Sequence, residues 1–174
     1  MLNTFGLQGS LMSNLELKIP PDVVWVAVAG LMWLTSRVTV CGLGAAESFR
    51  RPLAVMLIIV GTALIVAARV ALERAGTTWH PTEPGRTTAL VTSGVYRISR
   101  NPTYLGMHVV LLSWAVMLAS PVAVLLSLLF VVYIGRFQIR PEESILSVSL
   151  GQEYRDYSER VRRSAAGSEV DRQS

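Results

Sequence analysis

The sequence predicts an all-α integral membrane protein with about four transmembrane segments, the last two forming a helical hairpin, and a C-terminal amphipathic helix. Three observations support this fold class. Hydrophobic residues make up 51% of the 174 residues, and charged residues only 16%, whereas a typical soluble domain is about 25% charged. The apolar residues come in blocks, each long enough for a bilayer-spanning helix of about 20 residues. The charged residues stand between these blocks.

The first two apolar blocks predict two transmembrane helices within residues 23–72. One block runs from Val23 to about Ala46, and the other runs from Pro52 to about Leu72. Residues 1–22 precede them as an N-terminal segment. The polar residues 164–174 are predicted to form a disordered tail, because they lack the apolar side chains needed for a packed core.

The third apolar block is too long for a single crossing. No Asp, Glu, Lys or Arg occurs from Asn101 to Gly135, and one helix of this length would span about 52 Å. Pro121 stands near its middle. We therefore expect a helical hairpin within residues 103–139, with legs near 103–118 and 122–139.

The hairpin belongs to a larger region, residues 73–163, which is the candidate cofactor-binding and catalytic region. A polar segment rich in Thr, Pro and Gly leads from Glu73 to Arg100 and predicts a loop. After the hairpin, an amphipathic segment runs from Arg140 to about Arg163. Its last part, from Gly151 onward, is typical of a helix that lies on the membrane surface or folds back as a lid.

The basic residues indicate orientation in a membrane. Fifteen of the sixteen are Arg, and the formal net charge is +4. Arg residues gather in the 73–100 loop and in the C-terminal segment, which predicts a multi-pass protein with both on the cytoplasmic side, in the inner membrane if the source is a bacterium. Arg50 and Arg51 fall on the other side. The Arg residues form no basic stripe with aromatics, so we expect membrane lipids and no nucleic acid as partners.

The start of the charge-free block has features of an anion site. Pro102 suits the first turn of a helix, and Asn101 is a candidate N-cap. Free backbone N–H groups at a helix start, beside the positive charge of Arg100, could hold a carboxylate. An ordinary helix entering the membrane, with Arg and Tyr at the interface, explains the same residues equally well.

Two adjacent carboxylates follow the hairpin at Glu142 and Glu143. At helical spacing, Glu142 has Ile139, Ile145 and Leu146 three or four positions away, so at least one carboxylate faces apolar side chains. Such a group could accept hydrogen bonds from a ribose or an adenine amine. Alternatively, both are first-turn carboxylates that stabilise a helix N-terminus.

Other candidates are weaker. His80 and His108 are too few and too far apart for a metal site, so no metal is expected. Gly42-Leu43-Gly44 lies inside an apolar block with no preceding strand, and favours close helix packing over a dinucleotide loop.

Together, the stretch Leu90 to Tyr96, the run Arg100 to Tyr104, the uncharged hairpin, the Glu142-Glu143 pair and Gly151 to Tyr154 resemble the isoprenylcysteine carboxyl methyltransferase family. The resemblance covers about residues 86–163. It implies S-adenosylmethionine as the cofactor and a lipophilic or lipidated acceptor, methylated on a carboxylate, thiol or amine. Wider relatives of that family methylate phospholipids and thiols.

The resemblance also implies a set of site residues. The expected cofactor contacts are Thr88, Ala89, Leu90, Val91, Tyr96, Asn101, Pro102, Thr103, Tyr104 and Glu142. The expected catalytic residues are Arg100, Arg140 and Glu142. Three positions depart from the family pattern, which usually has His where Asn101 stands, His where Thr88 stands, and Arg, in the eukaryotic enzymes, where Gln138 stands.

Two other functions fit parts of the sequence. An NADPH-dependent sterol-type reductase carries a related Arg-x-Pro-x-Tyr segment, but such enzymes have more helices than this chain supplies. A non-enzymatic membrane scaffold would explain the apolar blocks and would have no use for buried carboxylates.

Overall fold

The computed structural model describes residues 19–38, 47–76 and 90–161, which form helices and turns and contain no strand. The elements are α2 (Pro21–Val38), α3 (Glu47–Arg74), the 3-10 helix η2 (Gly94–Arg97), α4 (Pro102–Leu118), α5 (Pro121–Ile134), the π-helical turn η3 (Gly135–Ile139) and α6 (Arg140–Arg160). The expectations for residues 1–18, for the tail, for Thr88 and Ala89, for His80 and for Gly42-Leu43-Gly44 lie outside the described residues.

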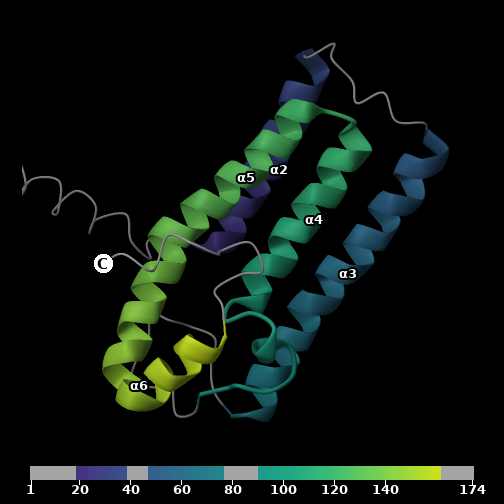
Figure 1. The fold of residues 1–174 in the computed structure, drawn as a ribbon. Helices are drawn as coiled ribbons and strands as arrows, with labels where there is room; N and C mark the ends of the chain where they lie inside the picture. Colours follow the sequence, from purple (N-terminus) through teal and green to yellow (C-terminus); the bar gives the residue numbers. More distant parts are fainter. Residues whose placement is uncertain (1–18, 39–46, 77–89, 162–174) are drawn as a thin grey trace, which may run out of the picture.

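Helices α2, α3, α4 and α5 run side by side, and the site elements gather at one end of them (Figure 1). Helix α4 packs most extensively against α3, and also contacts α5 and α2. Helix α2 packs against α5 as well. The chain enters α4 and leaves α5 at the same end, where η2 and α6 lie.

Helices α3 and α4 touch through two glycines. A Cβ atom added to Gly106 would stand 2.6 Å from the carbonyl oxygen of Gly61, and one added to Gly61 would stand 2.8 Å from that of Gly106. Small residues of this kind let helix backbones approach closely, which replaces the hydrophobic driving force that lipid cannot supply. This contact fixes α4, and with it the start of the hairpin, against α3.

The hairpin turn falls between Leu118 and Pro121. Ala119 takes a left-handed conformation with φ 50°, and the Ser120 side chain accepts a hydrogen bond from the backbone N–H of Ala123. The hydroxyl thus caps the first turn of α5. The hairpin has the legs 102–118 and 121–139, the second made of α5 and η3, close to the expected 103–118 and 122–139.

The helix does not end at the foot of the second leg, where Arg140 follows Ile139. The helix continues from α5 through η3 into α6, so the segment from Arg140 is no separate amphipathic helix at its start. Pro141 explains the π-helical turn, because its ring clashes with the carbonyl four residues earlier in a regular helix. The N–H of Arg140 instead donates to the carbonyl of Gly135, five residues back, which accommodates one extra residue.

The helix then breaks at Gly151. Its backbone angles are φ 56° and ψ −123°, a region that glycine populates readily and other residues avoid. The chain turns there and the last part of α6 lies back towards η2 (Figure 1). Of the two alternatives that the sequence left open, this favours the fold-back over a helix that lies along the membrane surface.

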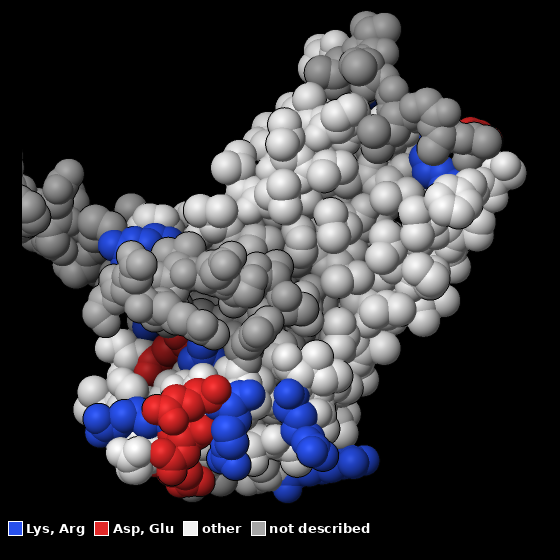
Figure 2. Space-filling view, in the orientation of Figure 1, with Lys and Arg blue, Asp and Glu red and all other residues white. Residues whose placement is uncertain are grey.

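Two of the described helices are long and apolar enough to cross a membrane: α3, and the continuous helix Pro121–Arg160. Helix α4 is a shorter apolar helix. Figure 2 shows charged side chains gathered at the lower end, over α6 and its neighbours, and a smaller group where α3 begins, with an uncharged band between them. This distribution fits a protein whose middle lies in lipid.

Candidate active site

The first part of the candidate site is the start of α4. Pro102 occupies the first turn and is fully buried. Asn101 holds the N-cap position, as expected, but its side chain makes no capping hydrogen bond. Its backbone N–H donates to Ser99 Oγ at 3.1 Å. Asn101 Nδ2 is buried and has no hydrogen-bond partner, so this amide is available to a ligand.

The Glu142 carboxylate joins the two legs of the hairpin. Tyr104 on α4 donates its hydroxyl to Glu142 Oε1 at 2.5 Å, across 38 positions of the chain. Gln138, in η3, donates Nε2 to the same oxygen at 2.9 Å. Because both bonds end on Oε1, Oε2 can still accept a hydrogen bond from a ligand.

Glu143 makes a second connection between the same elements. Its Oε1 lies 3.2 Å from Arg100 Nη1, and the exposed fractions of the two side chains are 9% and 11%. A buried charged group needs a partner of this kind, since desolvation without one is costly. Arg100 Nε is also buried and has no hydrogen-bond partner. One N–H of the guanidinium therefore remains for an anionic ligand.

The returning end of α6 covers the loop before α4. Tyr157 donates its hydroxyl to the backbone carbonyl of Tyr96 at 2.7 Å, and Tyr154 packs edge-on against Tyr157 with 6.2 Å between ring centroids. All three rings are buried. Burial, and secondarily the charge of Glu142, raises the pKa of Tyr96 to about 12. Tyr96 is therefore a neutral hydrogen-bonding group near Glu142 at physiological pH.

The structure brings most of the expected site residues to one end of the bundle. Tyr96 lies in η2, and Glu142 lies near the start of α6. The others lie directly before α4 or in its first turn: Arg100, Asn101, Pro102, Thr103 and Tyr104. Leu90 and Val91 are half-buried at the beginning of the described loop. Arg140 is exposed, so it lies at the surface of this end.

Three residues of this cluster were not among the expected site residues. Gln138 bonds Glu142, Glu143 pairs with Arg100, and Tyr157 anchors Tyr96. The spacing of four between Gln138 and Glu142 is a signal for the first. The other two depend on how distant segments fold together, for which the sequence carries no local signal.

The fold and this cluster define a membrane protein whose described residues are helical, with a polar site where a loop meets the helix ends. Residues 49–153 match the family model described as phospholipid methyltransferase. The chain belongs to this family of methyltransferases.

The chain is also similar to curated proteins. It is 34% identical over 109 residues to the protein-S-isoprenylcysteine O-methyltransferase of Rattus norvegicus, a match covering 61% of this chain and 37% of that protein. The corresponding enzyme A of Arabidopsis thaliana is also 34% identical over 109 residues, with 61% and 54% covered. An uncharacterized protein of Haemophilus influenzae is 40% identical over 60 residues, covering 34% of this chain and 95% of that protein.

The matches confirm the resemblance to isoprenylcysteine methyltransferases and support neither a reductase nor a scaffold. The chain spans between about a third and about half of the length of the named relatives that it matches.

Proposed function

We propose that the protein transfers a methyl group from S-adenosylmethionine to a lipophilic acceptor with a carboxylate, thiol or amine. One observation carries the proposal. Tyr104 and Arg100, at the start of α4, bind Glu142 and Glu143, at the start of α6. These contacts build a polar cluster that includes two buried donor atoms without a hydrogen-bond partner, Asn101 Nδ2 and Arg100 Nε.

The residues present fit the cofactor. S-adenosylmethionine carries a carboxylate, which needs donors, and ribose hydroxyls and amines, which need an acceptor. Asn101 Nδ2 and Arg100 Nε are buried donors without a hydrogen-bond partner, and the first backbone N–H groups of α4 favour an anion. Oε2 of Glu142 is the acceptor. Tyr96 and Tyr104 supply aromatic walls.

When bound, the cofactor supplies an electrophilic methyl group. The chain's own residues hold and orient the two reactants, because methyl transfer depends on in-line placement of the acceptor and the methyl group more than on acid–base groups. Orientation of two bound reactants contributes roughly 7–11 kcal/mol to lowering a barrier. In this scheme Arg100 and Asn101 hold the carboxylate end, and Glu142, fixed by Tyr104 and Gln138, holds the nucleoside end.

The acceptor is proposed as a lipophilic molecule reaching the site from the bilayer. The relatives' names specify protein-S-isoprenylcysteine, and the same class of acceptor is a candidate here. Gln138 is engaged with Glu142 and has no charge, so it cannot take the place of an arginine at an acceptor carboxylate. Arg140, exposed at the same end, is the residue we assign to an anionic acceptor.

We further propose four crossings, by α2, α3, α4 and α5, with the site on the cytoplasmic face. The Arg residues in the 73–100 loop and the C-terminal segment favour this orientation. Cysteine accessibility in a Cys41→Ala background tests it. Thr92→Cys and Ser144→Cys, both exposed, should react from one side of a sealed vesicle, and Ser48→Cys from the other. Labelling of all three from one side would contradict four crossings.

Binding of S-adenosylhomocysteine tests the cofactor directly. Detergent-purified protein should bind it by calorimetry and gain about 2.7 kcal/mol of stability at a hundredfold excess over the dissociation constant. Folded protein with neither heat of binding nor a thermal shift would contradict the proposal. A labelled methyl-donor assay on a membrane lipid extract, followed by mass spectrometry of the product, identifies the acceptor.

A further inference from the structure

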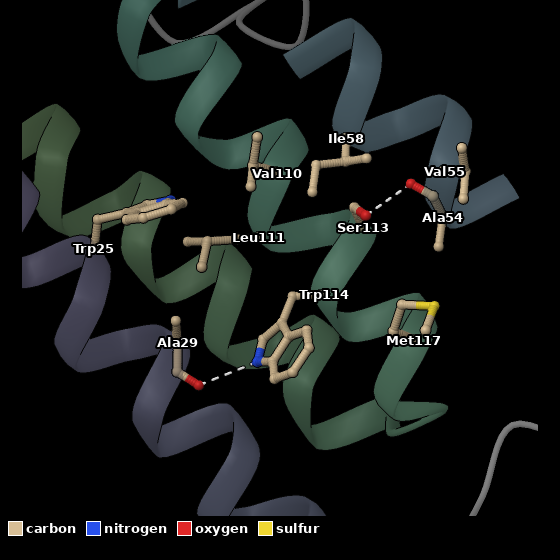
Figure 3. A pocket seen from close by; sticks show the side chains of 10 residues that line it. All are labelled: Trp25, Ala29, Ala54, Val55, Ile58, Val110, Leu111, Ser113, Trp114 and Met117. Carbon is tan, nitrogen blue, oxygen red and sulfur yellow. Dashed lines mark hydrogen bonds between the residues drawn. The ribbon is translucent and has the colours of Figure 1, made fainter. Parts of the chain in front are cut away.

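A groove of about 380 Å³ lies between α2 and α3, on the surface of α4 (Figure 3). None of the candidate site residues lines it. Its residues on α4 begin at Val110, six positions after Tyr104, which is about 9 Å further along the helix. Its volume is in the range of pockets that hold small molecules, roughly 300–1,000 Å³. The groove is thus a second place where a ligand could bind.

The polar side-chain groups in the groove wall are already bonded across helices. Trp25 Nε1 donates to the carbonyl of Met107 at 2.9 Å, and Trp114 Nε1 donates to that of Ala29 at 3.2 Å. Ser113 Oγ donates to the carbonyl of Ala54 at 2.8 Å. Figure 3 shows the last two of these bonds at the edges of the groove. An apolar wall of this kind suits a hydrocarbon chain and offers water few partners.

The groove opens towards the surroundings of the helices. Val55, Ile58 and Met117 line it and are 54%, 45% and 44% exposed. Helix α3, which carries the first two, is long and apolar enough to cross a membrane. In a bilayer the surroundings at this level are acyl chains. A chain lying in the groove would fill the space between α2 and α3.

Two arginines stand beside the groove at the beginning of α3. Arg50 and Arg51 come four positions before Ala54 and Val55, so each lies one turn away along the helix. Both pair with Glu47, at 3.5 and 3.0 Å, which leaves a net charge of +1 for the three. Arg50 Nε is buried without a hydrogen-bond partner. Arginine binds phosphate through its fork of N–H groups.

The distances along α3 match a phospholipid. Val55 and Ile58 follow Arg51 by four and seven positions, about 6 and 10 Å along the axis. The polar headgroup region of a bilayer leaflet is roughly 5–8 Å thick, since the whole bilayer of about 40–45 Å contains a hydrocarbon core of about 30 Å. A phosphate at the arginines would therefore place the start of an acyl chain at the groove.

We propose that the protein binds one anionic phospholipid here, with its phosphate at Arg50 and Arg51 and an acyl chain in the groove lined by Trp25, Val55 and Trp114. The bound lipid is no methyl acceptor, because its headgroup lies at the end of α3 opposite to Glu142. It bridges α2 and α3 instead. The site also accounts for two arginines that the positive-inside pattern leaves unexplained.

Quenching of tryptophan fluorescence by brominated acyl chains tests the site in vesicles. Replacing Trp33 and Trp79 by Phe leaves Trp25 and Trp114, both in the groove wall, as the reporters. Brominated phosphatidylglycerol should quench half-maximally at a several-fold lower mole fraction than brominated phosphatidylcholine. Equal quenching by the two lipids overturns the proposal, as does weak quenching by both, which a helix of a second copy in the groove would produce.

Matched variants separate the groove and the arginines from general lipid contact. Val55→Phe fills the groove and should remove the preference for the anionic lipid, whereas Val66→Phe, on the same helix and 52% exposed, should keep it. Arg50→Gln with Arg51→Gln should remove the preference, and Arg74→Gln, at the other end of α3, should not. Circular dichroism checks folding. A preference that survives both Val55→Phe and the arginine changes contradicts the proposed site.

Discussion

Tyr104 and Glu142 meet at 2.5 Å between oxygen atoms, although 38 positions separate them in the chain. The bond closes the open end of the hairpin, where α4 begins and the long second helix leaves the bundle. Glu142 also accepts a hydrogen bond from Gln138, so its carboxylate is held by residues of both α4 and η3. A group fixed in this way can bind a ligand without first losing side-chain entropy.

Replacing Glu142 should weaken cofactor binding more than replacing Glu143. Glu142→Gln removes an acceptor oxygen and, above pH 7, the charge of a carboxyl group whose pKa burial raises to about 7. This change corresponds to about 1.5–3 kcal/mol, or roughly ten- to a hundredfold in affinity. Glu143→Gln should do less, because its carboxylate is already paired with Arg100. Calorimetry with S-adenosylhomocysteine measures both, after circular dichroism shows both variants folded. Loss of binding in Glu143→Gln alone would show that the assignment to Glu142 is wrong.

Gly106→Ala should destabilise the protein strongly. The new Cβ would meet the Gly61 carbonyl oxygen at 2.6 Å, so α3 and α4 must move apart. We expect a loss of about 1–3 kcal/mol, the usual cost of overpacking, seen as a lower melting temperature in detergent. Gly30→Ala is the control, since nothing lies within 4 Å of its added Cβ. Equal effects in the two variants would mean that the α3–α4 contact is looser than described.

Gly151→Ala tests the break in α6. The backbone there has φ 56° and ψ −123°, so a side chain would cost about 1–3 kcal/mol if the turn is kept. Gly135 has a helical φ of −58° and open space around its Cβ. Gly135→Ala should therefore raise stability, by up to about 1 kcal/mol. We expect the melting temperature to fall in Gly151→Ala and to rise in Gly135→Ala. An unchanged melting temperature in Gly151→Ala would argue that α6 runs straight.

Tyr157→Phe removes the hydroxyl that donates to the Tyr96 carbonyl. Both groups are buried, so the carbonyl is left unsatisfied, at a cost of about 1–3 kcal/mol. We expect a lower melting temperature and faster proteolysis after residue 151, while Tyr133→Phe, on the hairpin's second leg, should have little effect. An unchanged proteolysis rate in Tyr157→Phe would show that other contacts hold the returning helix.

The sequence alone predicts those features of the fold that depend on a single segment of the chain. The charge-free run with Pro121 in its middle predicts a helical hairpin, because a single helix would be too long for a bilayer. Pro102 likewise marks the start of α4. The fold-back at Gly151 was one of two open alternatives. The π-helical turn was missed, because Pro141 alone does not tell whether a helix ends, kinks or bulges.

The candidate site was predictable only in part. Residues within one motif, such as Arg100 to Tyr104, could be named together from the resemblance. The pairing of Arg100 with Glu143 and the bond from Tyr157 to Tyr96 join segments distant in sequence. Their partners follow from the tertiary register of helices, which no periodicity within one helix encodes. The roles assigned to the site residues stay predictions until binding is measured.

The π-helical turn has a consequence for how sequences of this family should be aligned. Successive residues of a regular helix are rotated by about 100° about its axis. One inserted residue would therefore rotate all later side chains by this angle. The turn at Gly135–Ile139 absorbs its extra residue locally. In a relative with a regular α-helix there, one residue fewer between the hairpin turn and the two carboxylates would keep the carboxylates on the same side of the helix. A one-residue gap in this stretch is therefore neutral for the site, whereas the same gap directly after Pro141 would remove one carboxylate and put Glu143 in the place of Glu142.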